Sequence, residues 1–267
     1  MEKPLTDKRP TSPAANANTN ANDAAPATPE DYIAAYMPDR VIDATKAALV
    51  MVDMQYATGS REGALARKLA AEGSTVGDYR FARIETLVLP NTIALRQRFA
   101  ALGRPIVHVT IGAATEDASD APLHMRKLFV EFANHVGSRE HEILDELKPR
   151  AGEHVVRKTT IGAFASTGID SLLRALGCAQ LYMTGISTNM CVETTAREAA
   201  DRGYQVTLVE DACGTTHEEL HHNTMRNFQR LFGRVRATRE VLDELKDAKA
   251  APRMASPTVT KSVERTA

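Results

Sequence analysis

The sequence predicts an α/β fold with three layers, in which helices cover both faces of a doubly wound, mainly parallel six-stranded sheet. Short runs of uninterrupted apolar residues recur along the chain. Such runs are typical of strands that are buried on both faces, as in parallel sheets. Segments with apolar residues at helical spacing separate these runs, and several of them stop at a glycine, the residue preferred just beyond a helix end.

The predicted strands begin with residues 47–52 (AALVMV), a continuous apolar run that ends at Asp53. A shorter and weaker run at 154–157 ends at Lys158. The other predicted strands are residues 105–110, 181–186, 205–209 and 235–237.

Helical spacing of apolar residues predicts helices between and after these strands. They are residues 81–102, 138–147, 169–176, 189–202, 217–232 and 238–246. Ser138 and Thr238 are candidate N-caps, and Gly203 follows a helix as a candidate C-terminal cap.

Two long segments interrupt the alternation of strand and helix. Residues 57–80 follow the first strand and residues 112–137 follow the second, and we expect both to form lids or oligomer contacts. Residues 1–31 and 248–267 are low in complexity and have little apolar surface to bury, so they are predicted to be disordered tails. The single folded domain is therefore assigned to residues 32–247.

The composition excludes several classes of function. The 267 residues include 33 basic and 34 acidic side chains, which gives no basic surface for nucleic acid or an anionic membrane. No apolar run reaches the roughly 18 residues that span a bilayer, and the N-terminus lacks the apolar segment of a secretory signal. Three cysteines without a CxxC pair do not favour a disulfide framework or a zinc cage. We expect a cytoplasmic protein.

Cys191 is the most informative single residue. It follows the predicted strand 181–186 and a polar turn, and it falls in the first turn of the next predicted helix. The positive end of a helix dipole and nearby backbone N–H groups favour a thiolate. We therefore expect a lowered pKa and a nucleophilic Cys191.

An acid and an amine are predicted to lie near this thiol. Asp53, Lys158 and Cys191 each follow or end a predicted strand, and the carboxyl ends of parallel strands form the ligand-binding edge of such a sheet. A carboxylate can accept the proton of a thiol, and an ammonium group can orient both. The pattern predicts a cysteine nucleophile with a base and a cation.

These residues lie in motifs that resemble the isochorismatase-like cysteine hydrolase superfamily over roughly residues 45 to 245. The motifs are Val50–Gln55 (VMVDMQ), Lys158–Phe164 (KTTIGAF), Thr184–Arg197 (TGISTNMCVETTAR) and Val209–Ala212 (VEDA). The resemblance implies a Rossmann-like topology, no cofactor, and a homodimer or homotetramer.

The resemblance also implies a role for each site residue. Asp53 would be the general base, Lys158 the cation of the catalytic triad, and Cys191 the nucleophile. The Ile186–Ser187 peptide would be cis, so that the N–H groups of Ser187 and Cys191 form an oxyanion hole.

Departures from the family's motifs narrow the substrate. Nicotinamidases place an Asp-x-His pair after the second strand to bind a metal, whereas this chain reads His108–Ala113 (HVTIGA) there, so no metal is expected. The presence of Cys191 favours hydrolysis of a C–N bond, and its surroundings are most similar to ureidoacrylate-type and biuret-type amidohydrolases. The resemblance thus implies a hydrolase of linear amides whose substrate is a small amide or a ureido or carbamoyl compound, cleaved through an acyl-enzyme with release of ammonia or carbamate. A vinyl-ether hydrolase and a non-catalytic binding protein remain alternatives.

Further candidates surround the predicted triad. Gln55, Phe164 and Asn189 could line the pocket or simply pack against it. Three arginines in the insertions could meet an anionic substrate: Arg61, Arg80 and Arg126. Four histidines are expected to be structural, one in the core and three on a helix surface: His108, His217, His221 and His222.

Overall fold

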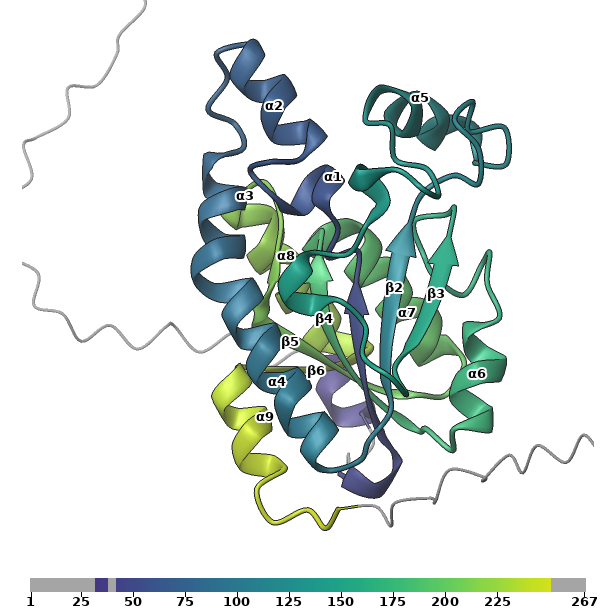
Figure 1. Cartoon of the computed structure of the whole chain (residues 1–267). Helices are drawn as coiled ribbons and strands as arrows, with labels where there is room; N and C mark the ends of the chain where they lie inside the picture. The colour runs from purple at the N-terminus through teal and green to yellow at the C-terminus, as the bar shows by residue number, and fades with distance from the viewer. Residues whose placement is uncertain (1–31, 38–41, 251–267) are drawn as a thin grey trace, which may run out of the picture.

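The computed structural model describes residues 32–37 and 42–250, and its centre is a six-stranded sheet in which every pair of neighbours is parallel. The strands are β1 (Ala47–Val52), β2 (Ile106–Ile111), β3 (His154–Lys158), β4 (Gln180–Ile186), β5 (Gln205–Gly214) and β6 (Gly233–Arg236). Their spatial order is β3-β2-β1-β4-β5-β6, which is the doubly wound order. The predicted fold class is therefore confirmed (Figure 1).

Helices cover both faces of the sheet, as the two-sided burial of the strands requires. The helices are α1 (Tyr56–Gly59), α2 (Ala64–Ala71), α3 (Asp78–Arg83), α4 (Leu89–Ala101), α5 (Leu123–Glu131), α6 (Ile169–Ala175), α7 (Glu193–Asp201), α8 (Glu218–Leu231) and α9 (Thr238–Glu244). Short 3-10 turns lie at Tyr32–Tyr36, Ala44–Lys46, Arg139–His141 and Asp145–Leu147, and π-helical turns at Ile84–Val88 and Thr188–Val192.

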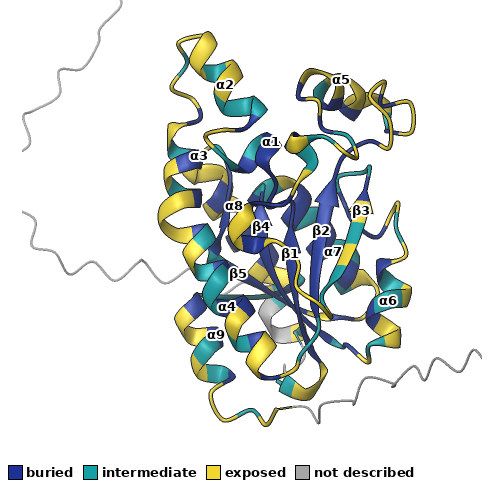
Figure 2. Ribbon diagram, in the orientation of Figure 1, coloured by how far each residue is buried: buried dark blue, intermediate teal, exposed yellow. Residues whose placement is uncertain are grey.

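Alternate residues of β1 face two separate cores. Ala48 and Val50 pack into the core that includes residues of α6, α7 and α8. Ala47 and Leu49 pack into the opposite core, against residues of α4 and the buried Val241 of α9. The strands β1, β2 and β4 are consequently buried along their whole length, whereas the edge strand β3 is partly exposed and α2 and α5 are largely exposed (Figure 2).

Both predicted insertions stand above the carboxyl ends of the strands (Figure 1). The segment 57–80 contains most of α1, all of α2 and the start of α3, and the segment 112–137 contains α5. The predicted helix 81–102 starts earlier, at Asp78, and runs through the π-helical turn into α4. The end of the insertion 57–80 therefore forms the first residues of this long helix.

The predicted helix 138–147 is wrong. Ser138 does accept a hydrogen bond from the His141 N–H (3.2 Å), as a cap should, but the chain becomes extended at Glu142. The residues that follow pair with the segment after β1, where Leu144 donates to the Met54 carbonyl (3.0 Å) and Ile143 bridges Gln55. Tertiary backbone pairing outweighs the local helical pattern here.

Smaller differences concern element ends. The fifth strand continues past residue 209 to Gly214, with an irregular register against β4 between Met183 and Gly185. Thr238 is the first residue of α9 rather than its cap, and its hydroxyl donates to Asp211 (2.7 Å). The predicted tail 1–31 and most of the predicted tail 248–267 lie outside the described residues.

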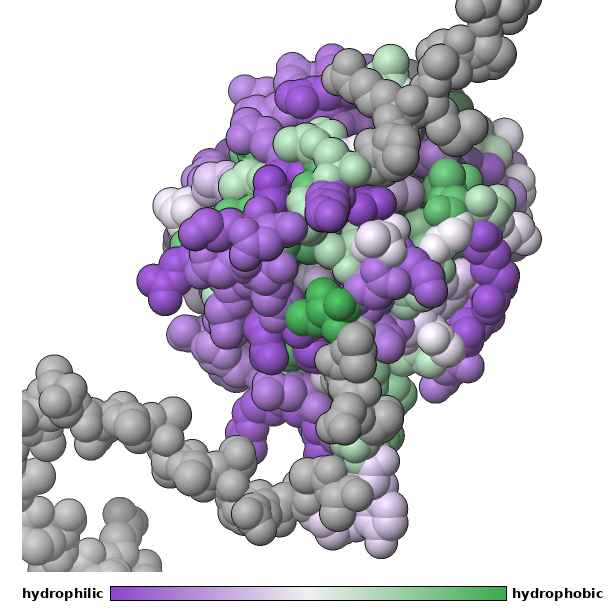
Figure 3. Space-filling view, turned by 90° about the horizontal axis from the view of Figure 1, so that it is seen from below, coloured by the Kyte–Doolittle hydropathy of each residue, from purple (hydrophilic) through white to green (hydrophobic). Residues whose placement is uncertain are grey.

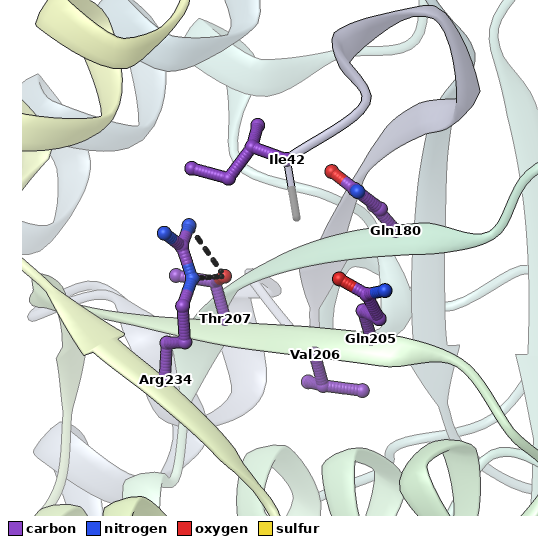
Figure 4. A pocket seen from close by; sticks show the side chains of 6 residues that line it. All are labelled: Ile42, Gln180, Gln205, Val206, Thr207 and Arg234. Atoms are coloured by element: carbon purple, nitrogen blue, oxygen red, sulfur yellow. Dashed lines mark hydrogen bonds between the residues drawn. The ribbon is translucent and has the colours of Figure 1, made fainter. Parts of the chain in front are cut away.

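The opposite end of the molecule carries the starts of the strands. Seen from this side, hydrophobic residues lie in scattered patches among hydrophilic ones (Figure 3). A small pocket at this end is lined mainly by the first residues of β4 and β5 (Figure 4). At its edge, Arg234 of β6 donates a hydrogen bond to the Thr207 hydroxyl (3.1 Å). Within residues 32–37 and 42–250, no helix combines the length and apolar character needed to cross a bilayer.

We expect Gly185→Ala to lower the free energy of unfolding by at least about 3 kcal/mol. Gly185 has φ +116°, and an added Cβ would lie 2.0 Å from the Val52 carbonyl oxygen of the neighbouring strand. The control is Gly177→Ala, where φ is +69° but no atom lies within 4 Å of the added Cβ, so a cost of about 1 kcal/mol is expected. Urea denaturation measures both, and equal costs would contradict the role given to the close contact.

Candidate active site

The candidate active site lies where the strand order of the sheet reverses. β1 and β4 are neighbours there, and Val52 pairs with both Gly185 in β4 and Val109 in β2. Asp53 follows β1 and Cys191 follows β4, so both leave the sheet at the same edge. Ligands of doubly wound proteins bind in the crevice beyond this switch point.

Asp53 and Lys158 form a buried ion pair at this edge. Lys158 is the last residue of β3, and its Nζ is 2.9 Å from Oδ2 of Asp53. The two side chains are 0% and 3% exposed, respectively. Lys158 also donates to the Thr160 carbonyl (3.1 Å). Since β2 separates β1 from β3, only the assembled sheet brings the two charges together.

Asp53 is held so that one carboxylate oxygen stays free. Its backbone is in the left-handed region (φ +53°), its N–H donates to Val109 (2.8 Å), and its carbonyl accepts from Gln55 (2.8 Å). Oδ1 is buried and has no hydrogen-bond partner in the described part of the chain. Burial raises the pKa of Asp53, although the neighbouring Lys158 opposes this shift. The free oxygen is an acceptor for a proton.

Cys191 lies in the π-helical turn Thr188–Val192, which leads directly into α7. The preceding Ile186–Ser187 peptide is cis, as the family resemblance implies. Cys191 is 8% exposed and lies within electrostatic reach of both Asp53 and Lys158. The structure therefore brings together all three residues of the predicted triad.

The expected lowering of the Cys191 pKa is wrong for the resting site. Burial and the negative charge of Asp53 raise the pKa of the thiol to about 12, although Lys158 opposes this shift. The loss of hydration and the carboxylate outweigh the helix end, on which the expectation rested. At neutral pH the resting Cys191 is consequently a neutral thiol.

The turn that carries Cys191 is anchored to α8. His221 Nδ1 lies 3.0 Å from the Thr188 hydroxyl, and its Nε2 lies 2.9 Å from a guanidinium nitrogen of Arg83. Because arginine can only donate, Nε2 is the acceptor and Nδ1 carries the proton that is donated to Thr188. Burial, with Arg83, lowers the pKa of His221 to about 3, so the ring is neutral. The expectation of a surface His221 is wrong, since it is 1% exposed.

The candidate substrate residues have partners within the protein. Gln55 accepts from the Ile111 N–H (2.7 Å) and donates to the His141 carbonyl (2.8 Å). Phe164 packs in the core beside Tyr204, with a ring-centroid distance of 6.0 Å. Asn189 is partly exposed and accepts from the Thr215 hydroxyl (2.6 Å). These contacts favour packing for Gln55 and Phe164 and leave Asn189 the most accessible of the three.

The three candidate arginines differ in whether they reach the candidate active site. Arg61 is half exposed and pairs with Glu85 (2.9 Å). Arg126 donates to carbonyls of its own loop, those of Ala121 and Ser119. Arg80 alone enters the site, where its charge acts on Cys191 and Asp53. No local sequence pattern distinguishes Arg80 from the other two.

Two pockets elsewhere on the described part of the protein are not lined by Asp53, Lys158 or Cys191. A hollow of about 450 Å³ lies beside β2 and β3 and is lined by Thr110, His141, Glu142, Ile143, Lys148, Pro149 and Val155. The small pocket of Figure 4 is at the other end of the strands. Among the described side chains, no group of three or more His, Cys, Asp or Glu is placed to hold a metal ion.

Fold and site together define a doubly wound α/β protein that carries an acid, an amine and a thiol at the switch point of its parallel sheet. The Isochorismatase domain model matches residues 47–240, which is more than half of the chain. The protein therefore belongs to the isochorismatase family and is an isochorismatase-family hydrolase. The family resemblance found in the sequence is confirmed.

Individual relatives agree with this assignment. A ureidoacrylate amidohydrolase, RutB of Variovorax paradoxus, is 30% identical over 241 residues, which cover 83% of this chain and 92% of that protein. The secreted isochorismatase effector Isc1 of Verticillium dahliae is 33% identical over 165 residues, 61% of this chain and 79% of that protein. The crystal structure of an isochorismatase family protein from Desulfovibrio vulgaris is 26% identical, with a TM-score of 0.62 over 75% of this chain and 98% of that chain.

We expect Lys158→Met to lower the free energy of unfolding by about 3–5 kcal/mol, because Asp53 is then buried without its partner. The double variant Asp53→Asn/Lys158→Met removes both charges and should recover most of this loss. Urea denaturation of the wild type and these variants measures the coupling. A double variant no more stable than the single one would contradict the importance of the ion pair.

Proposed function

We propose that the protein is a metal-independent cysteine hydrolase that cleaves the C–N bond of a small linear amide or of a ureido or carbamoyl compound. The observation that carries this proposal is the buried Asp53–Lys158 pair beside Cys191, with Oδ1 of Asp53 unpaired. The similarity to a protein named ureidoacrylate amidohydrolase supports the same bond class.

The first chemical step forms the nucleophile. Asp53 Oδ1 takes the proton of the Cys191 thiol as the sulfur attacks the substrate carbonyl carbon. Because the pKa of the resting thiol is raised, proton transfer and attack proceed together rather than from a preformed thiolate. Lys158 stays protonated beside Asp53 and holds the carboxylate in place through the 2.9 Å contact.

Backbone N–H groups stabilise the oxyanion of the tetrahedral intermediate. The Ser187 N–H has no acceptor among the described residues, and Cys191 supplies its own N–H from the turn that follows. Donors that are already in place stabilise the developing charge without reorganisation, and each typically contributes about 10²–10³ in rate.

The second half of the reaction releases the products. Protonated Asp53 gives its proton to the departing nitrogen, and the C–N bond breaks to leave an acyl-enzyme on the Cys191 sulfur. Asp53 then takes a proton from water as the water attacks the thioester carbon. The thiolate leaves and recovers that proton, and the acid or carbamate departs.

Two alternatives have less support. A vinyl-ether hydrolase of this family has no need for a cysteine in the turn after β4, where Cys191 lies next to a carboxylate with a free oxygen. In a non-catalytic binding protein, nothing would offset the cost of burying the Asp53–Lys158 ion pair beside the Cys191 thiol. A screen for ammonia release over ureido acids, biuret, carbamoyl amino acids and nicotinamide separates these functions.

We expect Cys191→Ala to lower kcat for an accepted amide by at least about 10³-fold, because it removes the nucleophile. Release of ammonia measures the activity, and circular dichroism checks that the fold is retained. The matched control is Cys178→Ala, since Cys178 is also 8% exposed but precedes β4, whereas Cys191 follows the other end of that strand. Activity retained in Cys191→Ala would refute the nucleophile assignment.

We also expect kcat/KM to fall as the pH is lowered through an apparent pKa above the ordinary aspartate value of about 4. Burial raises the pKa of Asp53, so the basic form is lost at a higher pH than in an exposed aspartate. A pH profile of kcat/KM for an uncharged substrate measures this limb. A profile that is flat down to the range of an ordinary aspartate would contradict the role of Asp53 as base.

A further inference from the structure

Arg80 reaches from α3 into the candidate active site, although it belongs to the insertion after β1. Its Nε donates to the Thr58 carbonyl (2.8 Å), and its Nη1 donates to the hydroxyl of Ser187 (2.7 Å). Ser187 is the residue that follows the cis peptide and precedes the turn with Cys191. These two hydrogen bonds hold the guanidinium beside the proposed oxyanion hole.

No ion pair among the described residues balances the charge of Arg80. Arg80 is 4% exposed and forms no ion pair with any residue that the structure describes. Lys158 already neutralises Asp53, so the four side chains of Asp53, Lys158, Arg80 and the neutral Cys191 carry a net positive charge. A buried charge without a counter-ion is costly, which indicates that an anion completes this site when a ligand is bound.

Burial lowers the pKa of Arg80 only to about 10, so the guanidinium remains charged at neutral pH. A guanidinium has five N–H donors, of which the contacts to Thr58 and Ser187 use two. The Nη2 atom of Arg80 forms no hydrogen bond to a described residue. Unlike Oδ1 of Asp53, this atom is not completely buried, so a ligand can reach it. The remaining donors form the planar fork that matches a carboxylate.

We propose that Arg80 binds a carboxylate of the substrate, so that the preferred substrate is a ureido or carbamoyl acid rather than a neutral amide. This inference rests on the proposed function. Ser187 sets the spacing, because its N–H faces the reacting carbonyl in that mechanism while its hydroxyl accepts from Arg80. The carboxylate of the substrate is therefore separated from the cleaved carbonyl by only a few bonds.

The test is direct binding to a protein that cannot turn the ligand over. Calorimetric titration of Cys191→Ala compares N-carbamoyl-β-alanine with its neutral carboxamide, which has the same length and shape. Charge-assisted hydrogen bonds predict that the acid binds about 10- to 100-fold more tightly. In Arg80→Gln/Cys191→Ala this preference should disappear, while binding of the carboxamide changes by less than about threefold.

The matched control is Arg61→Gln/Cys191→Ala. Arg61 comes from the same insertion but is exposed and paired with Glu85, so its removal should leave the preference for the acid unchanged. Arg80→Lys/Cys191→Ala keeps the charge without the planar fork and should retain part of the preference. These comparisons separate the local role of Arg80 from a general effect of lost positive charge.

Each outcome bears on a different claim. Equal binding of acid and carboxamide when Arg80 is present overturns the assignment, whatever the variants do. Equal weakening of both ligands in the Arg80→Gln background also overturns it, because Arg80 would then act only through Ser187. If neither ligand is hydrolysed by the wild type but the acid is still preferred through Arg80, the anion site stands and the proposed function fails.

Discussion

The buried ion pair between Asp53 and Lys158 is the interaction on which the rest of the site depends. Two opposite charges this deep in the protein are tolerated only as a close pair, and the 2.9 Å contact provides it. The pair also fixes where the free Oδ1 of Asp53 lies, because Lys158 occupies Oδ2. The ion pair thus sets the position of this free oxygen of Asp53, which is the base in the proposed mechanism.

The same low-dielectric setting explains the state of the thiol. Burial and the Asp53 carboxylate keep the proton on Cys191, whereas an exposed thiol at a helix start would ionise more easily. A neutral thiol is a weaker nucleophile than a thiolate, so the proposed reaction depends on transfer of this proton to Asp53. Arg80, held at Ser187, adds a positive charge to this buried site, and in our proposal it selects a ligand that carries a carboxylate.

A helix or strand could be predicted from the sequence where local residues determine it, and not where a distant segment does. The apolar run of β1 and the glycine-terminated α7 are local patterns, and both predictions agree with the structure to within a few residues. The segment 138–147 has an N-cap and helical spacing too, but Leu144 and Ile143 pair with residues after β1. That partner lies about ninety residues earlier in the chain, so no local pattern could show it.

The sequence by itself determined the fold class, the family and the identity of the three polar residues at strand ends, because these depend on periodicity and on ordered motifs. Only the tertiary structure decided which charges meet. It placed Lys158 on Asp53 across an intervening strand, raised rather than lowered the pKa of Cys191, and selected Arg80 from three similar arginines. Burial and distance control these outcomes, and both arise only when distant segments pack together.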